Sequence, residues 1–322
     1  MKNFWTEPKE KKINKKKLII AISIIIILIF LIITSIIYAN NKTARNWIDK
    51  NIFRKEINQD NLQVIELNEG ENPDIYAFNK YIGVLSKNTF NIYNNSGKKE
   101  QSLTLEITKP IFNSNNRHLV IAEEKGQKIY LITDKNIVWE KKIEGNISQV
   151  CVNKNGYVAV TIVDTSYKTV VAMYDNEGNK LFNTYLSSTR VGAITISNDN
   201  KYLALAELDT SGTVIKSNIK IISIDEAKNN PDNSIKKIYN GENNDLITDI
   251  QYQEKDKLVC MYTNKITVIK PDDSVETLTE NENKKISFTS IKLADTVVTI
   301  EEKNSGLFTA DSILNIINTE NK

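Results

Sequence analysis

Residues of the types that usually carry out catalysis or bind metals are scarce in this chain. It contains a single histidine, His118, and two cysteines, Cys151 and Cys260. Tyr157 and Tyr202 stand where His118 stands in similar segments of the chain, so we expect this histidine to pack rather than to react. A zinc or iron site of the usual ligand types needs several such side chains close together. The sequence therefore predicts no metal site and no cofactor.

The two cysteines, Cys151 and Cys260, each lie inside an apolar, strand-like run. Free cysteine is among the most buried residue types, so we expect two small buried side chains. A disulfide would need their Cα atoms within about 7 Å of each other, which the sequence does not establish. The chain has no phosphate-binding loop, no Gly-x-Ser-x-Gly turn and no paired zinc motif. We therefore expect that the protein is not an enzyme and name no catalytic residue.

Three glutamates recur at equivalent places in the chain. Glu123, Glu207 and Glu301 each fall near the end of the same strand in three similar segments. They could ring one face of the domain and bind a cation or a basic partner. The alternative is that they are ordinary hairpin charges that face water. These three residues are the candidate binding residues that the sequence offers.

The segments that carry these residues repeat, and the repeat predicts the fold. The clearest copies are Asn115–Ala122 and Asp199–Ala206, in which a polar turn leads into an apolar strand. Most copies are about forty residues apart, with longer gaps around residues 209–245. The expected strand starts lie near Tyr81, His118, Tyr157, Tyr202, Leu258 and Thr296.

A second strand and then a more polar strand follow each start. The expected second strands are Phe90–Tyr93, Ile129–Thr133, Val170–Tyr174, Ile219–Ile224, Ile266–Ile269 and Ile313–Ile317. The polar strands include Ile137–Ile143 and Lys180–Leu186. Four short antiparallel strands per repeat, with the fourth facing water, are typical of a β-propeller blade.

The turns resemble the Ser-Pro-Asp-Gly-Lys-Tyr-Leu-Ala turns of WD40-like and quinoprotein-like β-propellers, over roughly residues 62–322. The Gly-His and Trp-Asp dipeptides of WD40 repeats and the Trp-rich motifs of quinoproteins are absent. The resemblance implies an all-β propeller of about six four-stranded blades. The sixth repeat, Ile286–Ile317, lacks an outer strand, and a seventh blade is expected if the chain is incomplete.

The strand Leu62–Leu67 precedes the first repeat and has no adjacent hairpin partner. We expect it to pair with Ile313–Ile317 as the missing fourth strand and to close the ring. Left open, both strands would expose unpaired backbone groups along an edge.

A membrane anchor is predicted near the N-terminus. Leu18–Tyr38 contains no charged residue and is mostly Ile and Leu. A helix of this length covers the roughly 30 Å hydrocarbon core of a bilayer. The run exceeds the usual apolar region of a cleaved signal peptide, and Ile37 makes a poor site for a cut after Ala39. We therefore expect an uncleaved signal-anchor that contacts the lipid bilayer. The order of basic tail, single helix and propeller also resembles that of single-pass bacterial membrane proteins of uncharacterised function.

Basic residues set the expected orientation of the anchor. They crowd the residues before it: Lys9, Lys11, Lys12, Lys15, Lys16 and Lys17. Only two basic residues, Lys42 and Arg45, lie in the ten residues after the apolar stretch. Lys and Arg residues that flank a transmembrane helix favour its cytoplasmic side. We therefore expect a cytoplasmic N-terminus and an extracellular C-terminal domain at the cell membrane.

Four parts follow from these patterns. We expect a basic cytoplasmic tail at 1–17, a transmembrane helix at 18–38, a juxtamembrane helix and linker at 39–60, and an extracytoplasmic propeller at 61–322. Within the third part, residues 43–57 predict either an amphipathic helix at the membrane surface or a stalk that continues the anchor.

Charge and composition limit the partners. The whole chain carries +2 and residues 1–17 carry +5, so the remainder carries about −3. The remainder has no basic patch, and nucleic acid is not an expected partner. The leading expectation is a binding or scaffold module for an unknown protein, glycan or cell-wall partner. The alternative is a propeller hydrolase acting on cell-surface glycans, which would need a close pair of carboxylates.

Overall fold

The computed structural model describes residues 15–41, 44–45, 48–49, 52, 65, 67, 72–241, 245–280, 284–304 and 310–319. The chain divides into two compact units, Met1–Val64 and Ile65–Lys322, and each is described by itself.

The first unit contains the helix α1 (Lys15–Asn40), which is about 39 Å long. Its window Ile22–Ala39 has a mean hydropathy of 3.0 and no buried residue. By length and composition this helix is able to cross a membrane. The juxtamembrane helix expected at 43–57 lies largely outside the described residues. Ala44–Arg45 and Ile48–Asp49 are helical within it.

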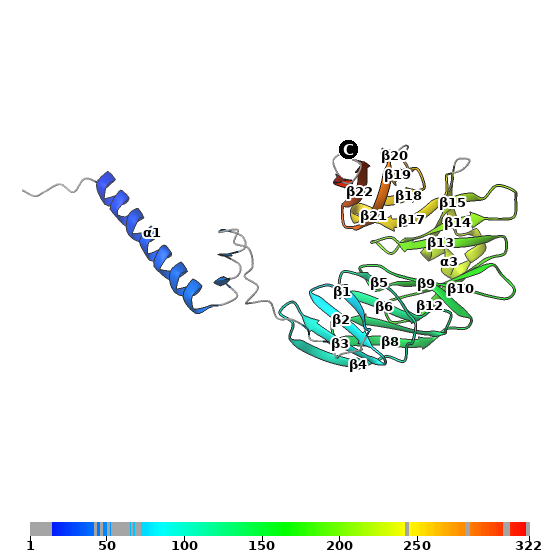
Figure 1. The fold of residues 1–322 in the computed structure, drawn as a ribbon, viewed down its shortest axis with the longest axis horizontal. Coiled ribbons are helices and arrows are strands. Elements are labelled where there is room, and N and C mark those ends of the chain that lie inside the picture. Colours follow the sequence, from blue (N-terminus) through cyan, green and yellow to red (C-terminus); the bar gives the residue numbers. More distant parts are fainter. Residues whose placement is uncertain are drawn as a thin grey trace, which may run out of the picture. The chain divides into compact units, whose positions relative to one another are not determined.

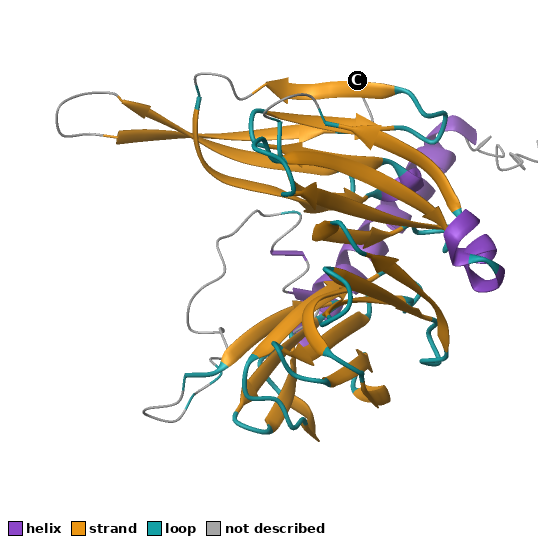
Figure 2. Ribbon diagram, turned by 90° about the vertical axis from the view of Figure 1, so that its right-hand side faces the viewer, coloured by secondary structure: helices purple, strands orange, loops and turns teal. Residues whose placement is uncertain are grey.

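The second unit consists almost wholly of strands in six antiparallel sheets (Figure 2). The strands of the first three sheets are β1 (Asp74–Phe78), β2 (Tyr81–Ser86), β3 (Thr89–Asn94), β4 (Lys99–Thr104); β5 (Pro110–Asn115), β6 (His118–Glu123), β7 (Lys128–Thr133), β8 (Asn136–Lys142); and β9 (Asn146–Val152), β10 (Val158–Val163), β11 (Thr169–Tyr174), β12 (Lys180–Leu186).

The strands of the last three sheets follow the same order along the chain. They are β13 (Thr189–Ile196), β14 (Tyr202–Asp209), β15 (Lys216–Ser223), β16 (Ile235–Asn240); β17 (Ile247–Tyr252), β18 (Leu258–Tyr262), β19 (Lys265–Ile269), β20 (Val275–Glu280); and β21 (Lys285–Leu293), β22 (Thr296–Asn304), β23 (Ala310–Asn318).

The sheets are the blades of a β-propeller. In Figure 1 the first strands of successive sheets, β1, β5, β9, β13, β17 and β21, lie around the centre of this unit, and the later strands of each sheet lie further out. Five blades have four strands and the sixth has three, counting the described residues. The predicted all-β propeller is therefore confirmed. We number the blades 1 to 6 in chain order.

Blades that follow one another along the chain, from blades 1 and 2 to blades 5 and 6, share an apolar core. Between blades 2 and 3, Val120 and Leu131 pack with Val160 and Ala172, all at most 2% exposed. The alternation of a strand sends every second side chain into the core on either side of its sheet. Removing this apolar surface from water is the main force holding the blades together. Cys151 and Cys260 are free and buried in two of these cores, as expected.

Polar side chains satisfy the open inner edges of the blades. Asn113 Oδ1 accepts the backbone N–H of Val152 from the next blade at 3.0 Å. Gln149 Nε2 donates to the carbonyl of Gly192 at 2.8 Å. Buried backbone groups need such partners, and here side chains of neighbouring blades provide them.

The predicted strand positions agree with the structure, with one local error. Five of the expected starts begin a strand, and β10 begins one residue later, at Val158. The strand expected to run through Ile224 instead ends at Ser223, where the helix α3 (Ile224–Asn229) begins. Ser223 caps this helix by accepting the N–H of Glu226, and the helix buries Ile224 and Ala227. A 3-10 turn, η2 (Pro231–Asn233), follows and fills part of the long gap in the repeat.

The predicted closing strand Leu62–Leu67 lies mostly outside the described residues. Ile65 and Leu67, which are described, are in neither a helix nor a strand. Among the described strands, β23 pairs with β22 alone. The ring closure therefore stays a prediction.

Candidate functional site

The three candidate glutamates occupy equivalent strand positions but have unlike surroundings. The Glu123 carboxylate accepts the backbone N–H groups of Thr108 at 2.6 Å and Lys109 at 3.0 Å. Glu207 is buried and lies 2.6 Å from Lys220 Nζ. Glu301 is half-buried in β22. Two of the three are thus held by groups of their own blade or of the loop that leads into it.

His118 packs between blades 2 and 3. The backbone of Lys154 lies near its ring and opposes the lowering of its pKa. A Cβ at Gly156 would lie 2.9 Å from His118 Nε2, so the ring lies directly against that turn. Burial lowers the pKa of His118, because the charged form loses water, and Arg117 nearby lowers it further.

The polar turns between the first and second strands of each blade form a distinct face. Asn153 Oδ1 accepts the N–H groups of Asn155 and Tyr157, both at 3.0 Å, and so closes its turn. Ser197 Oγ accepts the N–H of Tyr202 at 2.9 Å in blade 4. Asn and Ser favour turns for this reason.

The turns of blades 3, 4 and 5 each contain a left-handed residue. Gly156, Asn200 and Asp256 have φ of 84°, 63° and 53°. These residue types adopt positive φ more readily than others. The local sequence therefore sets the shape of the turns from which the site is built.

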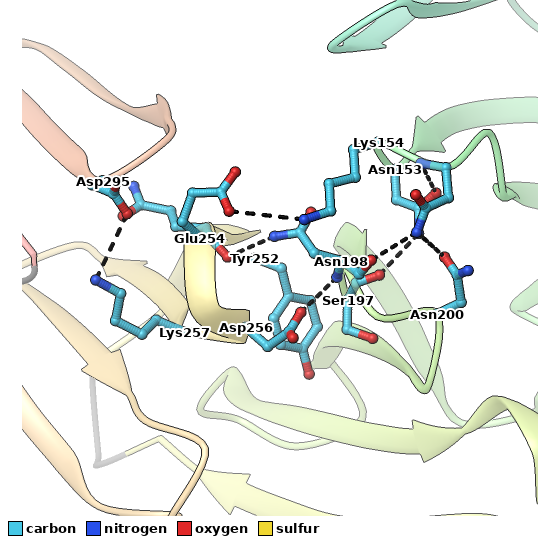
Figure 3. Close-up of polar contacts among 12 residues, drawn as sticks. Asn153, Lys154, Ser197, Asn198, Asn200, Tyr252, Glu254, Asp256, Lys257 and Asp295 are labelled. Atoms are coloured by element: carbon cyan, nitrogen blue, oxygen red, sulfur yellow. Dashed lines mark hydrogen bonds and ion pairs between the residues drawn. The ribbon is translucent and has the colours of Figure 1, made fainter.

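Hydrogen bonds join the turns of blades 3 and 4 (Figure 3). Asn153 Nδ2 donates to the Ser197 carbonyl at 2.9 Å and to Asn200 Oδ1 at 2.6 Å. Asn155 Nδ2 donates to the Asn198 carbonyl at 2.8 Å.

The same pattern continues through blades 5 and 6. Asn198 N–H donates to Asp256 Oδ1 and its Nδ2 to the Gln253 carbonyl, both at 2.7 Å (Figure 3). Gln253 Nε2 donates to the Ile291 carbonyl at 2.9 Å, and its Oε1 accepts Thr319 Oγ1 at 2.9 Å. We call this chain of contacts through Asn153, Asn155, Asn198, Gln253 and Thr319 the polar belt.

A polar pocket of about 340 Å³ is lined in part by Asn198 and Gln253 of the polar belt. The residues that line it come from five blades and surround the mouth of the central channel: Asn113, Ser114, Asn115, Asn116, Lys154, Asn198, Gln251, Tyr252, Gln253, Glu254, Lys292, Leu293 and Ala294. Lys154 Nζ lies 3.8 Å from Glu254 Oε2 and so links the turns of blades 3 and 5 (Figure 3). We call this the channel-mouth pocket.

Asp249 lies on β17, the inner strand that supplies Gln251 to the pocket. Burial raises the pKa of Asp249, while the nearby Lys292 and the Ile250 N–H oppose that shift. Among the described carboxylates, a raised pKa is resolved for Asp249 alone. The described residues also contain no cluster of three His, Cys, Asp or Glu side chains that would hold a metal.

The pocket is suited to polar recognition. Amides can donate and accept hydrogen bonds, and Lys154, Lys292 and Glu254 add charges of both signs. The sequence pattern did not predict this site, because the residues that line it are spread over five repeats. A usable signal was present, since Asn153, Ser197 and Gln253 hold the same place in successive turns.

Fold and site together define a β-propeller with a polar pocket at the mouth of its central channel. The chain belongs to DUF5711, a family of unknown function, whose model matches residues 54–322. A search of curated proteins gave no match.

Several solved propellers are similar to this chain. The WD40 domain of Neurospora crassa Pan2 is 9% identical, with a TM-score of 0.49, over 77% of this chain and 75% of that one. The β-propeller domain of Myceliophteria thermophila Cps50 (Swd1) is 12% identical, with a TM-score of 0.49, over 78% and 86%. Apo AztD from Citrobacter koseri is 14% identical, with a TM-score of 0.43, over 77% and 67%. All three TM-scores are below 0.5, so the fold assignment rests on the sheets themselves.

Proposed function

We propose that this protein is a membrane-anchored binding module whose propeller faces the outside of the cell and binds its partner at the channel-mouth pocket. The observation that carries the proposal is the pocket itself. Turns from several blades meet there, and the polar belt holds them in place. A ligand there would meet amides and charges that are already positioned, which lowers the cost of ordering on binding.

The anchor and its charges support the location. α1 is long and apolar enough to span a bilayer, and the lysines before it favour a cytoplasmic N-terminus. The partner is then a protein, a glycan or a component of the cell wall. Nucleic acid fits poorly, because the charge of the chain beyond residue 17 is slightly negative.

Binding fits the pocket better than catalysis. Glycoside hydrolysis needs two carboxyl groups on either side of the bond to be cut. The pocket lining contains one carboxylate, Glu254, and it is paired with Lys154. We therefore infer a binding module rather than a glycan hydrolase.

Site-specific photo-crosslinking of the full chain in membranes tests this proposal. A photoreactive residue replaces Leu293, which lines the pocket and is 49% exposed. The control position is Val275, which is 57% exposed on the outer strand β20. We expect a discrete adduct from position 293 and none from position 275.

Variants of the charged residues sharpen the result. Lys292→Ala or Glu254→Gln in the Leu293 crosslinking background should reduce the adduct, because each removes a charge from the pocket. Equal crosslinking at positions 293 and 275 would contradict the channel-mouth pocket as the binding site. So would an adduct yield from position 293 that neither Lys292→Ala nor Glu254→Gln reduces.

A further inference from the structure

A groove of about 570 Å³ lies between blades 2 and 3, apart from the channel-mouth pocket. One wall is the end of β8 and the residues that follow it, and the other is formed by β11 and β12. No residue lines both the groove and the channel-mouth pocket. We call it the inter-blade groove.

Strand register places a row of side chains along this groove. In the β11–β12 pair, Ala172 lies opposite Asn183 and Val170 opposite Tyr185. A register shift after Met173 places Tyr174 opposite Lys180. The row therefore alternates small apolar floor residues with polar and aromatic side chains on one face of the sheet.

Tyr185 offers an aromatic surface at the groove. It is 53% exposed. Its ring lies 4.8 Å from the ring of Tyr167, which supports it from the loop after β10. Deeper in, Tyr174 packs against Trp139 with ring centroids 6.1 Å apart. A supported, exposed aromatic ring has little freedom to lose when a ligand covers it.

Asn183 contributes a polar group that lacks a partner. Its Nδ2 donates to Tyr185 Oη at 3.1 Å, which orients the amide. Its Oδ1 is buried and has no hydrogen-bond donor in the described part of the chain. A buried acceptor without a donor is costly, and a ligand toward which the amide turns would supply that donor.

The rim of the groove is electrically balanced. Its charged residues are Glu140, Glu144, Asp164, Lys141, Lys142 and Lys180. Three acids face three lysines, so the groove favours neither a polyanion nor a polycation.

We propose that the inter-blade groove binds an uncharged saccharide chain. The apolar face of a sugar ring stacks on Tyr185, and a hydroxyl or acetamido group hydrogen-bonds with the side-chain amide of Asn183. Further hydroxyls meet the mixed charges of the rim. This inference goes beyond the channel-mouth pocket, and it stands or fails without it.

Calorimetric titration of the full chain in lipid nanodiscs tests the proposal, because sugar-based detergents would compete. The probes are chitotetraose, cellotetraose and maltotetraose, each up to about 5 mM, with an uncharged tetrapeptide as a contrasting ligand. We expect saturable binding of at least one saccharide and none of the peptide.

Three variants locate the binding. Tyr185→Ala and Asn183→Ala should each weaken it about 3- to 10-fold. Phe288→Ala is the matched control, because Phe288 is 52% exposed on β21 of blade 6, and it should bind as the parent does. Unchanged near-ultraviolet circular dichroism shows that each variant is folded.

Two outcomes would overturn the proposal. One is the absence of saturable saccharide binding by the parent protein. The other is binding that survives Tyr185→Ala and Asn183→Ala but is lost in Lys292→Ala, which would place the sugar at the channel mouth and leave the proposed function intact. In the first case, peptide binding that Tyr185→Ala weakens would identify the groove as a peptide site instead.

Discussion

Single polar side chains in this propeller shape their own turn and hold the next blade. Asn153 closes its turn through Oδ1 and reaches blade 4 through Nδ2. Asn198 is 8% exposed, and both its backbone N–H and its side-chain amide donate hydrogen bonds to blade 5. Such residues matter beyond the local turn, because removing one leaves buried groups of another blade unsatisfied.

Asn198→Ala should lower the free energy of unfolding by about 1–3 kcal/mol, because the Gln253 carbonyl loses its donor. Urea unfolding of the full chain measures the change. The control is Asn95→Ala, at an exposed turn position, which should change the free energy by less than about 0.5 kcal/mol. Equal effects of the two substitutions would show that the polar belt adds no stability.

His118→Phe should leave crosslinking of the partner intact, because the structure gives this ring a packing position against the turn of blade 3. The sibling positions Tyr157 and Tyr202 already hold aromatic rings. A folded variant that no longer forms the adduct from position 293 would require a chemical role for His118.

The pH dependence of stability offers a second test of His118. The unfolded chain protonates this residue near pH 6.5, whereas burial lowers its pKa in the folded protein. Below about pH 6.5 the unfolded state therefore binds more protons, and the free energy of unfolding falls. His118→Phe should remove this loss, so the two unfolding curves should diverge as the pH falls from 7 to about 5. Parallel curves would mean that the histidine keeps its ordinary pKa.

At the scale of elements, hydrophobic alternation and polar turns predicted nearly every strand. β2, β6, β14, β18 and β22 begin where the repeats indicated. Their signal is local, because each strand sits between two apolar cores and carries its own pattern. α3 was missed because six residues are too few for a helical period to emerge, and its burial depends on tertiary packing. The polar belt and the channel-mouth pocket were missed for a related reason, since contacts between turns of different repeats leave no local period.

Ring closure by Leu62–Leu67 is the remaining prediction at this scale. β16 ends at Asn240 and β17 begins at Ile247, the same spacing that separates Leu67 from Asp74 at the start of β1. The last blade also exposes an apolar surface, with Leu314 at 59% and Ile316 at 67%. The equal spacing means that the chain between Leu67 and Asp74 is long enough for a fourth strand of blade 6 to lead into blade 1.

Deletion of residues 61–68 should lower the Tm by several degrees, because each lost backbone hydrogen bond is worth about 1 kcal/mol. Replacing the same residues by an equal number of Gly and Ser keeps the tether length and should have the same effect. An unchanged Tm in both variants would mean that this strand closes nothing.

At the scale of the whole molecule, the charge split and the single apolar helix predict how the chain is placed. Residues 1–17 carry +5 and the remainder about −3, and the uncharged stretch Leu18–Tyr38 separates the charges of the two parts. The partner could not be derived from the sequence, because propellers host many functions and the residues of the channel-mouth pocket come from distant repeats. The proposed function therefore depends first on the propeller being outside the cytoplasm.

Labelling of single introduced cysteines in intact, wall-stripped cells tests that claim most directly. The native thiols give little background, because Cys151 and Cys260 are at most 4% exposed and burial raises the pKa of Cys151 to about 12. A membrane-impermeant maleimide should label Asn95→Cys, in an exposed turn of blade 1, before lysis. It should label Lys12→Cys, in the basic tail, only after lysis. The reverse pattern would place the propeller in the cytoplasm and contradict the account.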